Sequence, residues 1–137
     1  MILRNRKPGW RGRHQETVVA SIGRPFEWGV FDCAMFARDV VKAITLVDLA
    51  EGFPPYTSHA EGHLAVRRAG HLDFEGMFSS RLVAIPRPMM AIGDVCSIEF
   101  DGQKSMGVFN GPDVYVPAEQ GGLALVPSDN ILRGYAV

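Results

Sequence analysis

The stretch that most constrains the fold is residues 26–41, where an aromatic-rich segment leads into a helix. Gly29 predicts a turn, and Asp32 predicts the helix start, because its carboxylate can accept hydrogen bonds from the free N–H groups of the first turn. Beyond Asp32, apolar residues recur at the i, i+3, i+4, i+7 spacing of one helix face. They are Cys33, Phe36, Ala37, Val40, Val41 and Ile44. The pattern predicts a helix from Cys33 to about residue 50 with one buried face.

This helix places a thiol in its first turn. The positive end of a helix dipole favours the thiolate form, so Cys33 is a candidate nucleophile. The alternative is that Cys33 is a small apolar residue of the core, which is a common role for cysteine. Spacing alone does not separate the two interpretations.

The same stretch resembles a known family. The motifs PFEWG (residues 25–29) and FDCAMF (31–36) are similar to the nucleophile segment of NlpC-like cell-wall cysteine peptidases of the papain superfamily. The resemblance resumes at GDV (93–95) and MGVFNG (106–111), and covers roughly residues 14–137. More closely, the whole chain resembles a short branch of that superfamily found among bacteriophage tail proteins.

The resemblance implies that the general base is missing. In NlpC-like peptidases the catalytic histidine stands two residues before a strand glycine, and the matching position here is Ser105, before Gly107. A serine hydroxyl cannot accept a proton near neutral pH, whereas a cysteine peptidase needs a base, usually a histidine. The resemblance therefore implies the nucleophile position at Cys33, preceded by Asp32, without its partner.

Four histidines lie elsewhere: His14, His59, His63 and His71. His59 and His63 are one helical turn apart and could reach Cys33 if their helix crossed the cleft. The alternative is that both are exposed on a helix surface. No third ligand accompanies them, so we expect no metal site and no cofactor.

Other residues have similar alternatives. Trp28 and Phe31 could line a substrate groove or anchor the packing around the Gly29 turn. Asp94, at a strand start, is expected to stabilise a turn. Cys96 is expected to be a core residue, and a disulfide between Cys96 and Cys33 is not expected.

The composition fits one domain. Of 137 residues, 47% are hydrophobic and 21% charged, with a net charge of −1. Residues 1–13 form a basic N-terminal arm that is either a docking segment or a solvated end, and residues 14–137 form the domain. The charge gives no reason to expect nucleic acid as a partner. No apolar run is long enough to span a bilayer, and no signal peptide is recognisable.

The order of elements predicts an α+β fold. Helices are expected over residues 14–22 (presenting Val18, Val19 and Ile22), 33–50, 59–69 and 74–82, with Ser58 and Glu61 as a capping box before the third. Residues 85–88 are expected to be a rigid connector. A half-buried strand from 95 to 100 and strands near 104–109, 113–117, 122–126 and 133–137 follow. The predicted class is α+β, papain-like or NlpC-like, with N-terminal helices packed on a small C-terminal antiparallel sheet.

Three functions remain open, and one of them is binding without cleavage, in which the cleft holds a cell-wall peptide or the chain end of a partner; the other two are as follows. The first is a structural or adaptor component of a phage tail, at the tail tip or baseplate, with a degenerate peptidase fold and other tail proteins as partners. Such a protein is assembled in the host cytoplasm and leaves in the virion. The alternative is an active cysteine peptidase or amidase that cleaves peptidoglycan peptides during infection.

Overall fold

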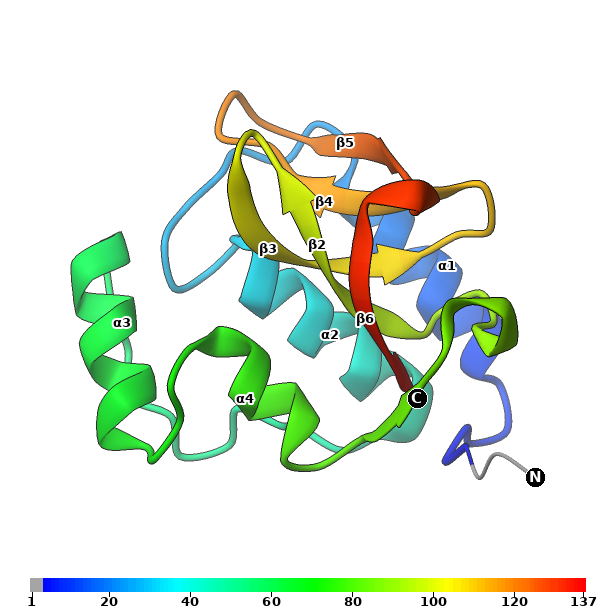
Figure 1. Ribbon diagram of the computed structural model, residues 1–137, viewed down its shortest axis with the longest axis horizontal. Helices are drawn as coiled ribbons and strands as arrows, with labels where there is room; N and C mark the ends of the chain where they lie inside the picture. The colour runs from blue at the N-terminus through cyan, green and yellow to red at the C-terminus, as the bar shows by residue number, and fades with distance from the viewer. Residues whose placement is uncertain (1–3) are drawn as a thin grey trace.

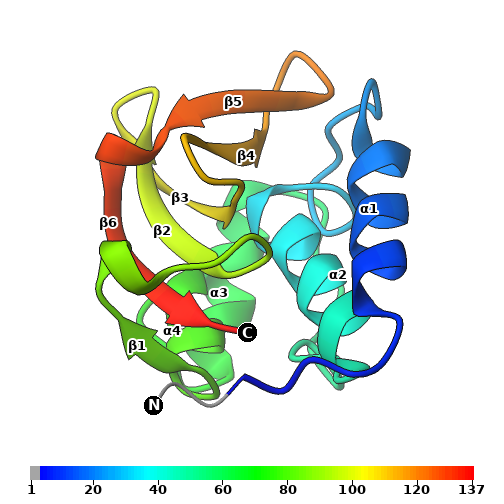
Figure 2. The same cartoon turned by 90° about the vertical axis from the view of Figure 1, so that its right-hand side faces the viewer.

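The helix that begins at Cys33 is the centre of the fold. In the computed structural model, which describes residues 4–137, helix α2 (Cys33–Thr45) lies between helix α1 (Trp10–Ser21) and the sheet (Figure 2). The predicted cap is confirmed, because Oδ1 of Asp32 accepts a hydrogen bond from the Met35 N–H at 2.8 Å. The predicted face is also buried at Phe36, Ala37, Val40, Val41 and Ile44, whereas Cys33 at its start is half-buried. The helix ends before the expected residue 50, since Leu46 adopts a left-handed conformation with φ 64° and closes it.

Helix α1 starts earlier than the sequence predicts. It begins at Trp10 instead of residue 14, because Gly9, with φ 82°, forms its N-terminal turn. The buried residues of the helix are His14, Val18 and Ser21. The prediction that this helix presents Val19 and Ile22 together with Val18 as its apolar side is wrong, since the side chains of Val19 and Ile22 are 57% and 68% exposed.

Helices α3 (His59–Arg68) and α4 (Phe74–Ser79) follow α2 and lie beyond its N-terminal half, away from α1 (Figure 1). Ser58 caps α3 as predicted, with Oγ accepting from the Glu61 N–H at 3.1 Å. The reciprocal bond differs from the prediction. The Glu61 carboxylate accepts from the N–H and hydroxyl of Thr57, both at 3.2 Å, instead of the Ser58 N–H. Helix α4 is capped by Asp73 and ends three residues before the predicted residue 82.

The second half of the chain forms a curled antiparallel sheet. Within residues 4–137 the sheet has six strands in the order β1-β6-β2-β3-β4-β5. They are β1 (Val83–Ile85), β2 (Val95–Phe100), β3 (Gln103–Phe109), β4 (Asp113–Pro117), β5 (Leu123–Pro127) and β6 (Ile131–Ala136), with short 3₁₀ helices at Arg87–Met89 and Ser128–Asn130. The predicted α+β class, with N-terminal helices and a C-terminal sheet, is confirmed.

Two strand predictions need correction. The expected connector at 85–88 contains the end of strand β1 and the start of a 3₁₀ helix, because β1 pairs with the C-terminal strand β6, which lies far along the chain. Strand β2 is buried on both faces rather than half-buried. Val95 packs in the cluster around α2, whereas Cys96 and Ile98 pack in a second cluster inside the curled sheet.

Asp94 joins the two ends of the chain. Its carboxylate, which is fully buried, pairs with Arg4 at 2.7 Å and Arg6 at 3.0 Å. It also accepts from the backbone N–H of Ala91 and of Val137. The turn-stabilising role predicted for Asp94 is confirmed, and the same side chain holds the described part of the basic arm. Residues 1–3 of the arm lie outside the described residues.

Candidate functional site

A cleft of about 430 Å³ opens where the N-terminus of α2 meets α3, α4 and strand β3. Its wall brings together most of the predicted site residues: Trp28, Asp32, Cys33, His59, His63 and Ser105. Phe31 is the exception. It is 0% exposed and packs against Phe36 at a ring separation of 6.0 Å, so it is a core residue and the described cleft wall does not include it.

The Gly29 turn sets the position of Asp32. Gly29 has φ 81°, and its N–H donates to Oδ2 of Asp32 at 2.8 Å. A Cβ on Gly29 would lie 2.0 Å from the carbonyl oxygen of Tyr56, so only glycine fits this approach. The Tyr56 hydroxyl also donates to Oδ2, at 2.5 Å. Both carboxylate oxygens of Asp32 are thus occupied at the base of α2.

The surroundings of the half-buried Cys33 thiol oppose its ionisation. Burial raises its pKa to about 11, and the negative charge of Asp32 acts in the same direction. Hydrogen bonds from the backbone of Met106 and of the first helical turn lower the pKa, but by less. The sequence-based expectation that the helix dipole favours thiolate is therefore outweighed by burial and by the helix's own capping residue.

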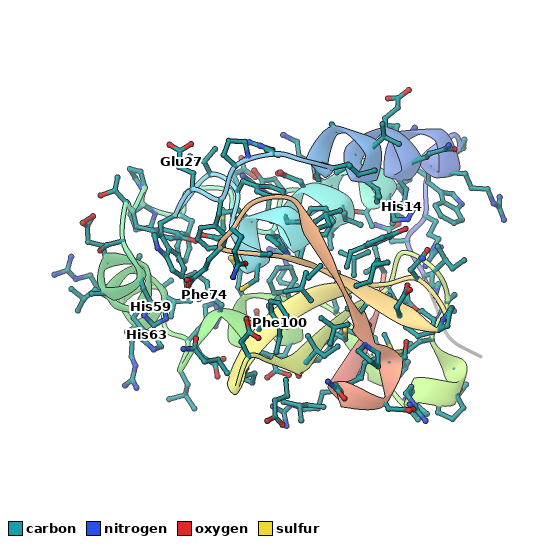
Figure 3. The ribbon with its side chains drawn as sticks, turned by 90° about the horizontal axis from the view of Figure 1, so that it is seen from above. His14, Glu27, His59, His63, Phe74 and Phe100 are labelled. Atoms are coloured by element: carbon teal, nitrogen blue, oxygen red, sulfur yellow. The ribbon has the colours of Figure 1, made fainter. Side chains whose placement is uncertain are left out.

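Two of the four histidines, His59 and His63, line the same cleft as the thiol. His59 and His63 lie side by side on α3 (Figure 3). Their ring centroids are 5.2 Å apart, and the His59 ring also lies 5.2 Å from the Trp28 ring. Both histidines are exposed. Within residues 4–137, no side-chain hydrogen bond joins Cys33 to a histidine. His14 lies on α1, away from this group (Figure 3), and its partly aromatic environment includes Trp10.

A charged cluster beside the thiol was not predicted. Glu75, on α4, is 6% exposed and accepts hydrogen bonds from Arg133 at 2.7 and 2.8 Å, Lys104 at 2.9 Å and Tyr135 at 2.5 Å. Burial alone would raise its pKa, but these donors outweigh burial and hold the pKa of Glu75 well below its usual range. The cluster fastens α4 to the sheet and forms one side of the cleft.

Lys104 directly precedes Ser105 and also lines the cleft. It bonds Asp73 at 2.5 Å in addition to Glu75. Although burial opposes its charge, these two carboxylates raise the pKa of Lys104. Lys104 is therefore held as a cation and cannot accept a thiol proton.

No pattern along the chain pointed to these residues. Tyr56, Phe74 and Glu75 lie in helices or loops far from the cysteine motif, and no local spacing links them to it. Lys104 was adjacent to a predicted site residue, but its ion pairs depend on where α4 packs.

Comparison with known proteins assigns the chain to a family. A family model described as "Domain of unknown function (DUF6950)" matches residues 5–137, nearly the whole chain. The chain belongs to the DUF6950 family. No curated protein matches this DUF6950 chain.

Solved structures show its fold. This DUF6950 chain is similar to the crystal structure of the NlpC/p60 domain of the peptidoglycan hydrolase SagA, with a TM-score of 0.60 and 15% sequence identity. The match covers 92% of this chain and 97% of that domain. The fold is therefore NlpC-like, as the cysteine motif predicted.

Residues 4–137 contain no group of three or more His, Cys, Asp or Glu side chains placed to hold a metal ion. No described helix has the length and apolar character needed to cross a membrane.

Proposed function

We propose that this chain is a non-hydrolytic NlpC-like module that serves as a structural or adaptor component of a bacteriophage tail. The observation that carries the proposal concerns the Cys33 thiol. Its pKa is raised to about 11, and no described side chain accepts a hydrogen bond from it. A thiol whose pKa is raised above its usual range is almost entirely protonated at pH 7.5.

Each group beside the thiol is unsuited to the role of base. Ser105 stands where the resemblance to NlpC-like peptidases places the catalytic histidine, and its hydroxyl cannot accept a proton near neutral pH. Asp32 is already bonded by Met35, Gly29 and Tyr56, and Lys104 is a paired cation. Cysteine peptidases need both a nucleophile and a base that is oriented towards it. His59 and His63 lie on the same cleft wall, but within residues 4–137 neither makes a hydrogen bond to the thiol.

The location in a virion rests on the resemblance of the whole chain to short phage tail proteins. Partners in this proposal are other tail-tip or baseplate proteins. The described part of the basic arm supports an adaptor role, because Arg4 and Arg6 pack on the domain through Asp94 and leave Lys7 and Arg11 exposed. Mass spectrometry of purified particles of the encoding phage tests this location. Absence of the protein from the particles would overturn the proposed virion location.

The catalytic part is tested with purified peptidoglycan. Wild type and Cys33→Ala are incubated with it at pH 7.5, and soluble muropeptides are measured by chromatography and mass spectrometry. The NlpC/p60 domain of SagA serves as the positive control. We expect no release by either form of this chain. Release by the wild type alone would show an active hydrolase and overturn the proposal.

A further inference from the structure

The cleft beside Cys33 has exposed aromatic faces and unpaired carboxylates that a purely structural role leaves unexplained. We infer that it binds an extended peptide segment of a neighbouring protein through a lysine or arginine side chain of that segment. This role rests on the proposed function, because a bound segment persists only if the cleft does not cleave it.

The aromatic rings form a continuous row along one wall. Phe26 meets Trp28 edge-to-face at 4.8 Å, Trp28 contacts His59 at 5.2 Å, and His59 contacts His63 at 5.2 Å. Phe74 and Phe100 also line the cleft, and Figure 3 shows both in the same region as the two histidines. Faces of Trp and Phe attract cationic side chains within about 6 Å of the ring. The aliphatic stem of lysine or arginine also packs well on such rings.

The charge of the cleft matches a cationic guest. Five carboxylates line it, those of Asp32, Asp73, Glu75, Asp101 and Glu119, against the single cationic side chain of Lys104. Lys104 is already paired with Asp73 and Glu75, and Arg133 also pairs with Glu75. Asp101 and Glu119 are exposed and form no ion pair within residues 4–137. These two carboxylates are therefore free to pair with a guest side chain next to the aromatic row.

Polar groups on the wall favour a peptide over a simple cation. The side chains of Gln103, Ser105 and Gln120 line the cleft without a hydrogen-bond partner in the described chain. A peptide backbone carries a donor and an acceptor at most residues, which need partners when they leave water. The cleft volume of about 430 Å³ is within the usual range for ligand pockets.

Binding is tested on the full chain by NMR with a defined peptide. The probe is an N-acetylated, C-amidated pentapeptide, Gly-Ala-Lys-Ala-Gly, whose only charge is the lysine side chain. The reference is the same peptide with norleucine in place of lysine. We expect titration to shift the Trp28 indole and the Ser105 and Gln120 amide signals, with binding at least tenfold weaker for the norleucine peptide.

Variants identify the charged contacts. Asp101→Asn combined with Glu119→Gln removes the two free carboxylates without touching any described hydrogen bond, and we expect at least tenfold weaker binding. The control, Glu16→Gln with Glu51→Gln, makes the same charge change at exposed positions outside the cleft and should alter affinity by less than twofold.

The outcomes separate the two proposals. Four results would overturn the peptide site and leave the non-hydrolytic role standing. They are no shift at cleft residues, equal binding of the norleucine peptide, unchanged affinity of the cleft variant, and equally tight binding of spermidine, a polyamine without a peptide backbone that is titrated as a further reference. Conversely, mass spectrometry that detects cleavage of the bound peptide by wild type but not by Cys33→Ala would overturn the non-hydrolytic role. Intact peptide with lysine-dependent shifts supports both.

Discussion

The hydroxyl of Tyr56 donates a hydrogen bond to Oδ2 of Asp32 at 2.5 Å, one residue before the cleft thiol. Burial first, and then the charge of Asp32, raise the pKa of Tyr56, so it remains a donor at any physiological pH. The bond holds the capping carboxylate in place, and both of its oxygens accept hydrogen bonds. That carboxylate both starts helix α2 and disfavours a second negative charge on Cys33.

The Cys33 thiol should react as an unactivated thiol. In a Cys96→Ala background, which leaves one thiol, we expect the alkylation rate with iodoacetamide to rise about tenfold per pH unit from pH 7 to 10, because the thiolate fraction rises in proportion. The pKa of about 11 predicts no plateau in this range. A plateau below pH 9 would reveal an activated thiolate and contradict this prediction.

Ser105→His should lower the pKa of Cys33. An imidazole on the cleft wall can take the thiol proton, and the resulting ion pair stabilises thiolate. We expect the alkylation rate at pH 7.5 to rise about tenfold or more relative to wild type. Ser105→Gln adds a side chain of comparable length without a base and should leave the rate unchanged. Equal rates for the two variants would mean that residue 105 does not face the thiol.

Gly29→Ala should destabilise the fold strongly. The new Cβ would meet the Tyr56 carbonyl oxygen at 2.0 Å and would require alanine at φ 81°. Overpacking and the left-handed conformation together cost about 2–4 kcal/mol in the free energy of unfolding. Gly23→Ala has a similar φ of 76° but meets nothing within 4 Å, so it isolates the conformational cost of about 1 kcal/mol. Urea unfolding measures the loss of stability of both variants. Equal losses for Gly29→Ala and Gly23→Ala would contradict the close approach of residue 29 to the Tyr56 carbonyl oxygen.

Glu75 should make stability depend on acid pH. Its pKa is depressed in the folded state relative to the usual 4.5, so its stabilisation is complete above about pH 5. The free energy of unfolding should fall as pH decreases below that value, because the unfolded chain then binds a proton that the folded chain resists. Urea titrations from pH 6 to 3 test this. The Glu75→Gln variant should be less stable than wild type at pH 6 and should lose less free energy of unfolding between pH 6 and pH 3. If the two proteins lose the same amount, Glu75 is not the group responsible for the pH dependence.

Asp94→Asn should release the N-terminal segment. The substitution removes the charge that pairs with Arg4 and Arg6, and we expect a loss of about 2–3 kcal/mol in stability. Trypsin should cut after Arg4 and Arg6 at least about threefold faster, as followed by mass spectrometry. Asp129→Asn removes an exposed ion pair with Arg87 and serves as the control. Unchanged cleavage would mean that Asp94 does not hold the segment.

Local patterns predicted the elements whose cause is local. The Asp32 cap, the buried face of α2 and the Ser58 cap depend on neighbours within a few residues, and the structure confirms each of them. Strand β1 was missed because its partner, β6, lies about fifty residues away in the sequence. The α2 end was misplaced because Leu46, an unusual residue type for a left-handed cap, closes it.

The sequence by itself determined the α+β class, the cysteine at a helix start and the serine two residues before the strand glycine. It did so because helix caps, periodicity and turns are encoded over short distances along the chain. Only the tertiary structure decided whether the thiol ionises, since that depends on burial and on Asp32 held by Tyr56 from another segment. It also decided that Glu75, Lys104, Asp101 and Glu119 surround one cleft, because packing alone brings these distant residues together.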